Sequence, residues 1–329
     1  MFEIPILLIF FNRPDKFEKV FEVICELKPQ ILYLYQDGAR INNKNDEINM
    51  KKCREIIEKG LNWPCEVHKK YQDKNYGCDP SGYIAHTWLF SNEEFGIVLE
   101  DDVVPDITFF EFCRQLLYKY KDDNRINMIC GMNQFGKTNT DNSYVFSRYC
   151  SIWGWASWAR VVNGWDPEYH FLEDKEKCLE IKKRFVNNKE YKNFLHACRR
   201  HKASGKEHFE SILWSNSFLN DRYTIIPKVN LISNIGVGSE TTHGTDDIRI
   251  LPKKQQLLFN APVYHMIFPL KHPNTIKLDK KFERGFYVSY FEKYFQKVEI
   301  LYYRLKYKGF KDTCRKINEM ILKRYGAKK

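Results

Sequence analysis

The first 130 residues alternate short apolar runs with segments of helical periodicity. The run IPILLIFF (4–11) precedes a segment whose apolar residues fall on one helical face: Phe17, Val20, Phe21, Ile24 and Leu27. Further strands are expected at ILYLYQ (31–36), CEVHKKY (65–71) and FGIVLE (95–100), with helical segments expected near 45–60 and 80–92. This alternation predicts an α/β fold, Rossmann-like, with a mainly parallel sheet and helices on both faces.

Three consecutive acids, Glu100, Asp101 and Asp102, follow the apolar run 96–99 and precede Pro105. In open α/β sheets ligands bind at the carboxyl ends of strands, where these acids are expected. Adjacent carboxylates repel one another, and a bound cation would relieve that repulsion. Oxygen ligands suit Mg²⁺ or Mn²⁺. The alternative is a solvated turn, in which acids are also common.

The cysteines and the apolar runs bear on the cellular compartment. The ten cysteines are scattered with no C-x-x-C pair, which favours free thiols over zinc or disulfides. No apolar stretch reaches the roughly 18 residues of a membrane span. The run 4–11 is short and follows an acid, Glu3, so it is typical of a strand and not of a signal peptide. We therefore expect a cytoplasmic protein.

The net charge of +11 is concentrated near the C-terminus, where residues 280–329 hold 15 Lys and Arg and 5 acids. The nearly neutral remainder argues against a nucleic-acid-binding protein. Apolar residues of this tail recur at helical spacing: Tyr287, Phe291, Tyr294, Val298, Leu301 and Leu305. A basic amphipathic helix over 282–329 predicts contact with an anionic membrane surface. The alternative is a helical pair docked on the body.

An ordered set of motifs resembles a known family: FFNRP, QDGAR, NYGC, VLEDDVVPDITFFEFC, WGWASW and PKVNLISNIGVGSETTHGT. Together they are similar to a bacterial family of GT-A-fold nucleotide-sugar glycosyltransferases and, more remotely, to N-acetylglucosaminyltransferase I type enzymes. The resemblance covers roughly residues 4–245. It implies a metal-dependent, inverting transfer of a hexosyl or N-acetylhexosaminyl group from a nucleotide donor, most often a UDP-sugar. The implied acceptor is a glycan or lipid-linked glycan of the capsule or lipopolysaccharide type.

The resemblance also implies roles for individual residues. Asp102 would be the direct ligand of Mn²⁺ or Mg²⁺, and His243 a further ligand, although a lone histidine is also a common structural residue. The implied donor-binding residues are Asn12, Arg13, Asp37, Asp101, Gly154 and Trp155. Gly154 between two tryptophans indicates a backbone close to a ligand, whereas clustered tryptophans are more often core.

Inverting transfer also needs a general base on the acceptor side. In the stretch KEHFESILWSN, Glu210 occupies the position of the family's acid, and Phe209 replaces the family's tryptophan. Glu207 is the nearest competitor. Either acid could instead stabilise the start of a helix.

We expect three segments: a GT-A glycosyltransferase domain over 1–250, a connection over 251–281 and the basic helical tail over 282–329. Two other functions remain open. A sugar-1-phosphate nucleotidyltransferase also binds nucleotide and metal, but FFNRPDKF lacks its usual glycine-rich basic signature. A non-catalytic protein binding glycans or the membrane surface would turn over no nucleotide sugar.

Overall fold

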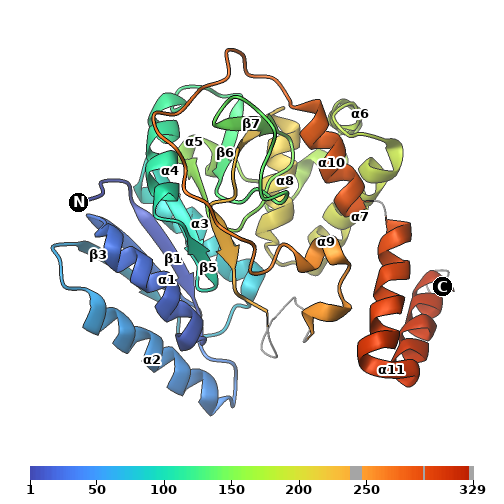
Figure 1. Ribbon diagram of the computed structural model, residues 1–329, viewed down its shortest axis with the longest axis horizontal. Helices are drawn as coiled ribbons and strands as arrows, with labels where there is room; N and C mark the ends of the chain where they lie inside the picture. The colour runs from blue at the N-terminus through green and yellow to red at the C-terminus, as the bar shows by residue number, and fades with distance from the viewer. Residues whose placement is uncertain (238–246, 292, 326–329) are drawn as a thin grey trace.

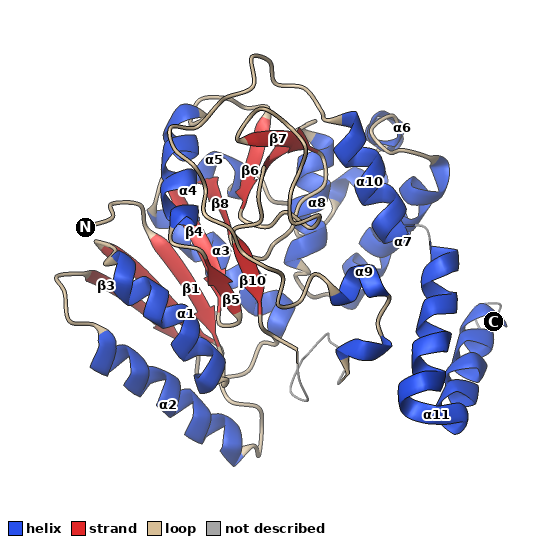
Figure 2. Ribbon diagram, viewed as in Figure 1, coloured by secondary structure: helices blue, strands red, loops and turns tan. Residues whose placement is uncertain are grey.

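The computed structural model describes residues 1–237, 247–291 and 293–325. Its centre is an eight-stranded sheet with the order β3-β2-β1-β4-β8-β6-β9-β7 (Figure 2). The strands are β1 (Ile6–Phe10), β2 (Ile31–Gln36), β3 (Glu66–Tyr71), β4 (Phe95–Glu100), β6 (Ile126–Cys130), β7 (Tyr144–Ser147), β8 (Trp155–Trp158) and β9 (Tyr223–Pro227). Only β7 and β8 run antiparallel to their neighbours. The predicted α/β class with a mainly parallel sheet is confirmed.

Helices cover both faces of this sheet (Figure 1). One face carries α1 (Pro14–Leu27), α2 (Lys44–Gly60) and α4 (Thr108–Lys119), and the other carries α3 (Cys78–Asn92), α5 (Ala159–Val162) and α8 (Phe209–Leu219). Strand β1 shows why two cores form. Leu8 packs in the cluster that contains Phe17, whereas Leu7 points to the opposite cluster with Leu89, because successive side chains alternate across a strand.

A two-stranded antiparallel pair lies beside the main sheet. Strand β5 (Val103–Pro105) directly follows the acidic residues, and β10 (Ile232–Asn234) pairs with it in a register that sets Asn234 opposite Val103. A late segment of the chain therefore covers the turn that the sequence predicts to bind a ligand.

The lysine-rich region 173–203 is mostly helical. It contains the end of a 3₁₀ turn, η1 (His170–Glu173), followed by α6 (Lys175–Lys182) and α7 (Asn188–Ser204). Beyond β10 come a second 3₁₀ turn, η2 (Ile248–Ile250), and the short α9 (Lys253–Gln256).

The first tail helix, α10 (Lys280–Phe291), packs on the body. Phe282 and Phe286 are buried, and Phe286 stacks on Tyr149 with ring centroids 4.4 Å apart. The carboxylate of Glu283 accepts a hydrogen bond from the backbone N–H of Arg148 at 2.9 Å. Helix α10 is therefore docked on the body, as the alternative to membrane contact predicts. Of the two tail helices, α11 is the one that could face a membrane.

That helix, α11 (Lys293–Tyr325), breaks at Gly309, whose φ of 82° is left-handed, and its two arms fold back on each other (Figure 1). Arg304 and Asp312 join the arms by an ion pair of 2.5 Å. The hydroxyl of Thr313 donates to the carbonyl of Gly309 at 2.9 Å. Within the described part of the chain, no helix combines the length and apolar character that crossing a bilayer requires.

Candidate functional site

The acidic turn lies where β1 and β4 end side by side. Because these strands are parallel neighbours, residues 11–13 meet residues 100–102. The backbone N–H of Phe11 donates to Oδ2 of Asp101 at 3.0 Å. Arg13 donates from Nη1 to Oδ2 of Asp102 at 2.8 Å and from Nη2 to Oδ1 of Asp101. Three of the predicted site residues, Arg13, Asp101 and Asp102, are therefore in direct contact.

Strand β10 covers the acidic turn. The N–H of Ile235 donates to the carbonyl of Asp102 at 2.8 Å, and Nδ2 of Asn234 lies 3.4 Å from Oδ1 of the same residue. A Cβ at Gly236 would fall 2.1 Å from Oδ2 of Asp102, so only glycine fits this approach. Asp102 is just 7% exposed, which differs from the freely solvated turn that the sequence left open.

Negative charge exceeds positive charge at this site. Burial first, and then repulsion from Asp102, Asp101 and Glu210, together raise the pKa of Glu100 to about 8. The pKa of Asp101 is also raised, first by burial and then by the charge of Asp102, although Arg13 opposes both. Burial alone would lower the pKa of Arg13, but the two aspartates raise it overall. A second cation would relieve the remaining repulsion.

The residues of the turn fit a divalent cation that is also bound by phosphate oxygens of a substrate. Among the described residues, no group of three or more His, Cys, Asp or Glu side chains could hold a metal without help. Mg²⁺ is commonly bound through one or two carboxylates together with phosphate oxygens of a substrate. Asp102 supplies such a carboxylate, so a cation that arrives with a diphosphate suits this turn. His243, the other predicted ligand, lies outside the described residues.

Asp37 at the end of β2 organises a loop. Its carboxylate accepts hydrogen bonds from the backbone N–H groups of Gly38 at 3.0 Å, Tyr76 at 2.9 Å and Gly77 at 3.0 Å. Gly77, with φ of 86°, is the residue before α3. Asp37 therefore fixes the start of α3, and its expected role in donor binding stays a prediction.

Asn12 takes part in a polar network that the sequence did not indicate. Its Nδ2 donates to Oδ1 of Asp46 at 2.7 Å. Arg40 binds the same carboxylate from Nε at 2.7 Å and Nη2 at 2.6 Å. Asp46 is 1% exposed and lies in the first turn of α2. The only local signal was Asn43, three residues earlier, which caps that helix by accepting from the N–H of Asp46.

Gly154 and Trp155 serve packing. A Cβ at Gly154, where φ is 65°, would lie 2.6 Å from Cδ1 of Ile232 on β10. Trp155 is 1% exposed, pairs with Val98 across the sheet, and places its ring 5.1 Å from that of His86. The Trp155 side chain therefore lies in the core, as the alternative interpretation of the clustered tryptophans has it. The donor contact expected of Gly154 and Trp155 stays a prediction.

Glu210 lies in the first turn of α8 and is exposed. Its charge contributes to the raised pKa of Glu100 and, after burial and nearer acids, to that of the Cys78 thiol, which reaches about 12. Glu207 instead contributes, after burial, to the raised pKa of Tyr83. Of the two competing acids, Glu210 is thus the one within electrostatic reach of the acidic turn. Its place near a helix N-terminus is also compatible with a helix-stabilising role.

Fold and site together define a Rossmann-like α/β protein with an acidic turn at the carboxyl end of β4, bridged by an arginine from the end of β1. No protein-family model matches the chain. No curated protein matches it either.

Several solved structures show a distant likeness. HddC from Yersinia pseudotuberculosis is 10% identical over 50% of this chain and 80% of its own, with a TM-score of 0.30. The 4-diphosphocytidyl-2C-methyl-D-erythritol synthase of Anaerococcus prevotii is 10% identical over 67% and 99%, with a TM-score of 0.30. Mouse xyloside xylosyltransferase 1 is 10% identical over 65% and 81%, with a TM-score of 0.33. At these values the likenesses assign neither a family nor an activity to this chain.

Proposed function

We propose that the protein is a metal-dependent, inverting glycosyltransferase of the GT-A type that transfers a sugar from a nucleotide donor, a UDP-sugar, to a surface glycan. The observation that supports this most is the arginine-bridged pair Asp101 and Asp102 at the carboxyl end of β4, with Glu210 within electrostatic reach. Ligands of open α/β sheets bind at this edge.

The donor side of the reaction depends on the acidic turn. Asp102 would hold Mg²⁺ or Mn²⁺, which stabilises the negative charge of a departing nucleoside diphosphate. Arg13, which forms ion pairs with both aspartates here, would then offer N–H groups to phosphate oxygens, because a guanidinium binds phosphate well. Asp101 would contact hydroxyl groups of the ribose or sugar.

The acceptor side depends on Glu210. An inverting transfer needs a carboxylate that accepts the proton of the attacking hydroxyl. Glu210 is exposed and lies on α8, whereas the acidic turn follows strand β4. It could therefore act on an acceptor, a glycan or lipid-linked glycan, while the donor occupies the turn.

A thermal-shift screen of nucleotide sugars with and without Mn²⁺ tests the proposal. A ligand that binds the folded state raises the melting temperature. We expect a rise with a UDP-sugar only when Mn²⁺ is present, and release of UDP once a suitable acceptor is added. Absence of any metal-dependent shift across all nucleotide sugars would contradict the proposal.

The same reagents separate the two other functions. A nucleotidyltransferase would release pyrophosphate from a nucleoside triphosphate and a sugar-1-phosphate. A non-catalytic binding protein would bind a glycan without turnover of any nucleotide sugar. The excess of buried acids at the turn favours an enzyme, because three clustered carboxylates contribute little stability without a cation.

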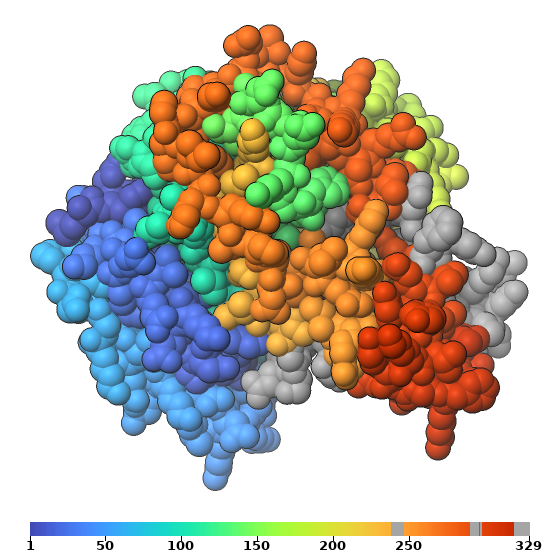
Figure 3. Space-filling view, in the orientation of Figure 1, coloured from blue at the N-terminus to red at the C-terminus, as the bar shows by residue number. Residues whose placement is uncertain are grey.

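The helix α11 supports the further proposal that the enzyme works at the cytoplasmic face of a membrane. Residues 293–325 contain 10 Lys and Arg and 3 acids. Exposed apolar side chains lie on the same helix, most of all Phe310, which is 75% exposed, with Leu305, Tyr302 and Val298. This part of the chain projects at one edge of the molecule (Figure 3). Apolar and basic side chains together suit an anionic lipid surface.

A further inference from the structure

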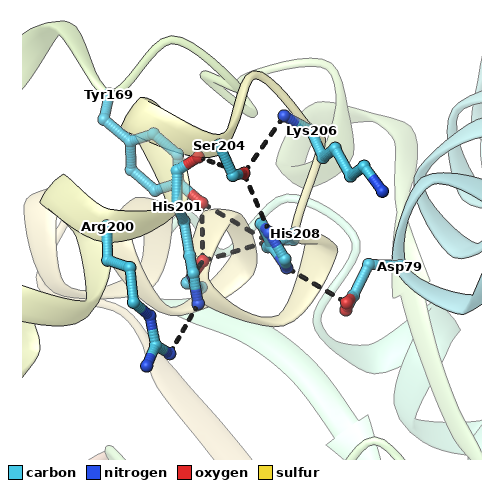
Figure 4. A network of polar contacts seen from close by, with 8 residues as sticks. Asp79, Tyr169, Arg200, His201, Ser204, Lys206 and His208 are labelled. Atoms are coloured by element: carbon cyan, nitrogen blue, oxygen red, sulfur yellow. Dashed lines mark hydrogen bonds and ion pairs between the residues drawn. The ribbon is translucent and has the colours of Figure 1, made fainter. Parts of the chain in front are cut away.

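Two histidines stack beside the start of α8, which carries Glu210. His201 lies in the last turn of α7 and His208 directly precedes α8. Their ring centroids are 4.0 Å apart and the rings are 21° from parallel (Figure 4). On the other side of His208, Oδ2 of Asp79 in the first turn of α3 lies 3.0 Å from Nδ1.

The hydrogen bonds of His201 define its protonation. Arg200 can only donate, so Nε2 of His201 accepts its hydrogen bond at 3.1 Å. The ring proton therefore lies on Nδ1, which donates to the Ser211 hydroxyl at 2.7 Å. That hydroxyl in turn donates to the carbonyl of His208 at 3.1 Å. His201 is thus neutral, and its pKa is lowered by burial first and then by the charges of His208 and Arg200.

The partners of His208 imply the opposite state. The carboxylate of Asp79 accepts, so Nδ1 of His208 carries a proton. Nε2 lies 3.1 Å from the Ser204 hydroxyl, whose own proton goes to the carbonyl of His201 at 2.7 Å. Nε2 must therefore donate as well. The stack consists of one imidazolium, His208, and one neutral imidazole, His201.

The same contacts join α3 to α8. Asp79 on α3 binds His208 at the start of α8, and one turn further along α3 a Cβ at Gly82 would lie 2.6 Å from Cδ1 of Phe209. The loop before α3 is itself held by Asp37. A continuous set of contacts therefore connects the carboxyl edge of the sheet to the first turn of α8, where Glu210 lies.

We propose that Asp79 and His208 are positioning residues for Glu210, and that His201 makes this position dependent on pH. The proposal rests on the proposed function of Glu210. As pH falls, protonation of His201 places a second cation 4.0 Å from the His208 ring. Repulsion between the two cations then weakens the stacking of His201 on His208. Loss of the His208 charge would remove the ion pair to Asp79. Transfer therefore requires the state with one charge in the stack.

Other charged groups on the packed elements enter this balance. They are Arg200 on α7, Lys206 and Glu207 in the loop before α8, and Glu210 on α8 itself. Tyr169, at the start of η1, keeps its proton because burial raises its pKa to about 12, and it donates to the Ser211 hydroxyl at 2.5 Å. The only carboxylate in hydrogen-bond contact with the stack in Figure 4 is Asp79.

The first measurement needs no activity. An NMR titration of the histidine ring protons, assigned with His201→Phe and His208→Gln, should give His201 a pKa below the ordinary histidine value. Removal of the His208 charge should raise the pKa of His201. An ordinary His201 pKa in the wild-type protein, or a His201 pKa that does not respond to His208→Gln, would overturn the assignment of the stack.

The second measurement is the pH profile of transfer. His208→Gln and Asp79→Asn should lower kcat by between about tenfold and about 100-fold, the range expected for a misplaced catalytic group, with donor affinity within about twofold of wild type. His201→Phe keeps an aromatic stack that cannot be protonated, so it should move the acid limb of the profile to lower pH. An acid limb that His201→Phe leaves in place would contradict the proposal.

The chain offers a matched control. His170 and Asp166 form another His–Asp pair, at 2.9 Å, but His170 is 73% exposed and lies outside the stack. His170→Gln should change neither kcat nor the pH profile. If the wild-type protein transfers no sugar at all, the proposed function fails, while the NMR titration still decides whether the stack exists as inferred.

Discussion

Arg13 donates from Nη1 to Oδ2 of Asp102 across 2.8 Å, and its other terminal nitrogen binds Asp101. One guanidinium from the end of β1 thus bridges two carboxylates from the end of β4. Any cation that binds Asp102 has to share this carboxylate with Arg13 or displace it. The donor site is therefore expected to respond to substitutions that keep the shape of these side chains but change their charge.

Asp102→Asn should remove the dependence of UDP binding on Mn²⁺ while the fold is retained. The amide has the size of the carboxylate, which matters because Asp102 is buried under Gly236, but it is a poor ligand for a hard cation. Calorimetry of UDP with Mn²⁺ measures the change, and circular dichroism checks the fold. Unchanged affinity in a folded variant would remove Asp102 from the metal site.

Glu210→Gln should keep donor binding and lose transfer, because the base acts on the acceptor and not on the diphosphate. We expect kcat to fall by about 100-fold or more, within the range for loss of a general base. Glu207→Gln is the matched control, since Glu207 lies three residues away and is not among the main charges that raise the pKa of Glu100. If Glu207→Gln loses transfer and Glu210→Gln keeps it, Glu207 is the base.

His86→Phe should reduce the acid sensitivity of the fold. His86 is buried with neither ring nitrogen hydrogen-bonded, and burial lowers its pKa from 6.5 to about 3. Below pH 6.5 His86 therefore binds a proton in the unfolded chain but not in the folded chain, so the free energy of unfolding falls as pH falls. The loss is about 1.4 kcal/mol per pH unit.

Urea unfolding at pH 7 and pH 5 measures this effect. The advantage of His86→Phe over the wild type should grow by about 2 kcal/mol between these two pH values. The exposed His170→Phe serves as a control and should show no such growth. A difference that is the same at both pH values would mean that His86 is protonated in the folded state.

The exposed face of α11 should bind anionic vesicles. In a flotation assay the full chain should associate with vesicles that contain phosphatidylglycerol and dissociate as salt rises, because each basic residue near such a surface contributes about 1 kcal/mol. Leu305→Asp with Phe310→Asp should abolish flotation. Ile41→Asp alters an apolar residue elsewhere on the body that is even more exposed, at 91%, and it should not abolish flotation. A chain that stays in solution at low salt would leave α11 as a structural element or an oligomer contact.

Some of the predicted site emerged because its residues are close to strand ends in the sequence. Arg13 follows β1, and Asp101 with Asp102 follows β4, so parallel pairing alone brings them together. For Trp155 the sequence was less informative. The neighbouring Gly154 indicated a ligand, yet the antiparallel strand β8 places the Trp155 ring in the core against His86. The direction of β8 depends on its neighbours in space and leaves no mark in its four residues.

The apolar runs, the helical periodicity and the acids after β4 are local features, and the sequence alone determined from them the α/β class and the place of the acidic turn. The tertiary structure decided which distant segments meet there. Gly236 closes over Asp102, Asp79 reaches His208, and α10 docks against Tyr149. Each of these contacts joins residues more than 100 positions apart. Such pairings depend on how the whole core packs, which no single stretch of sequence predicts.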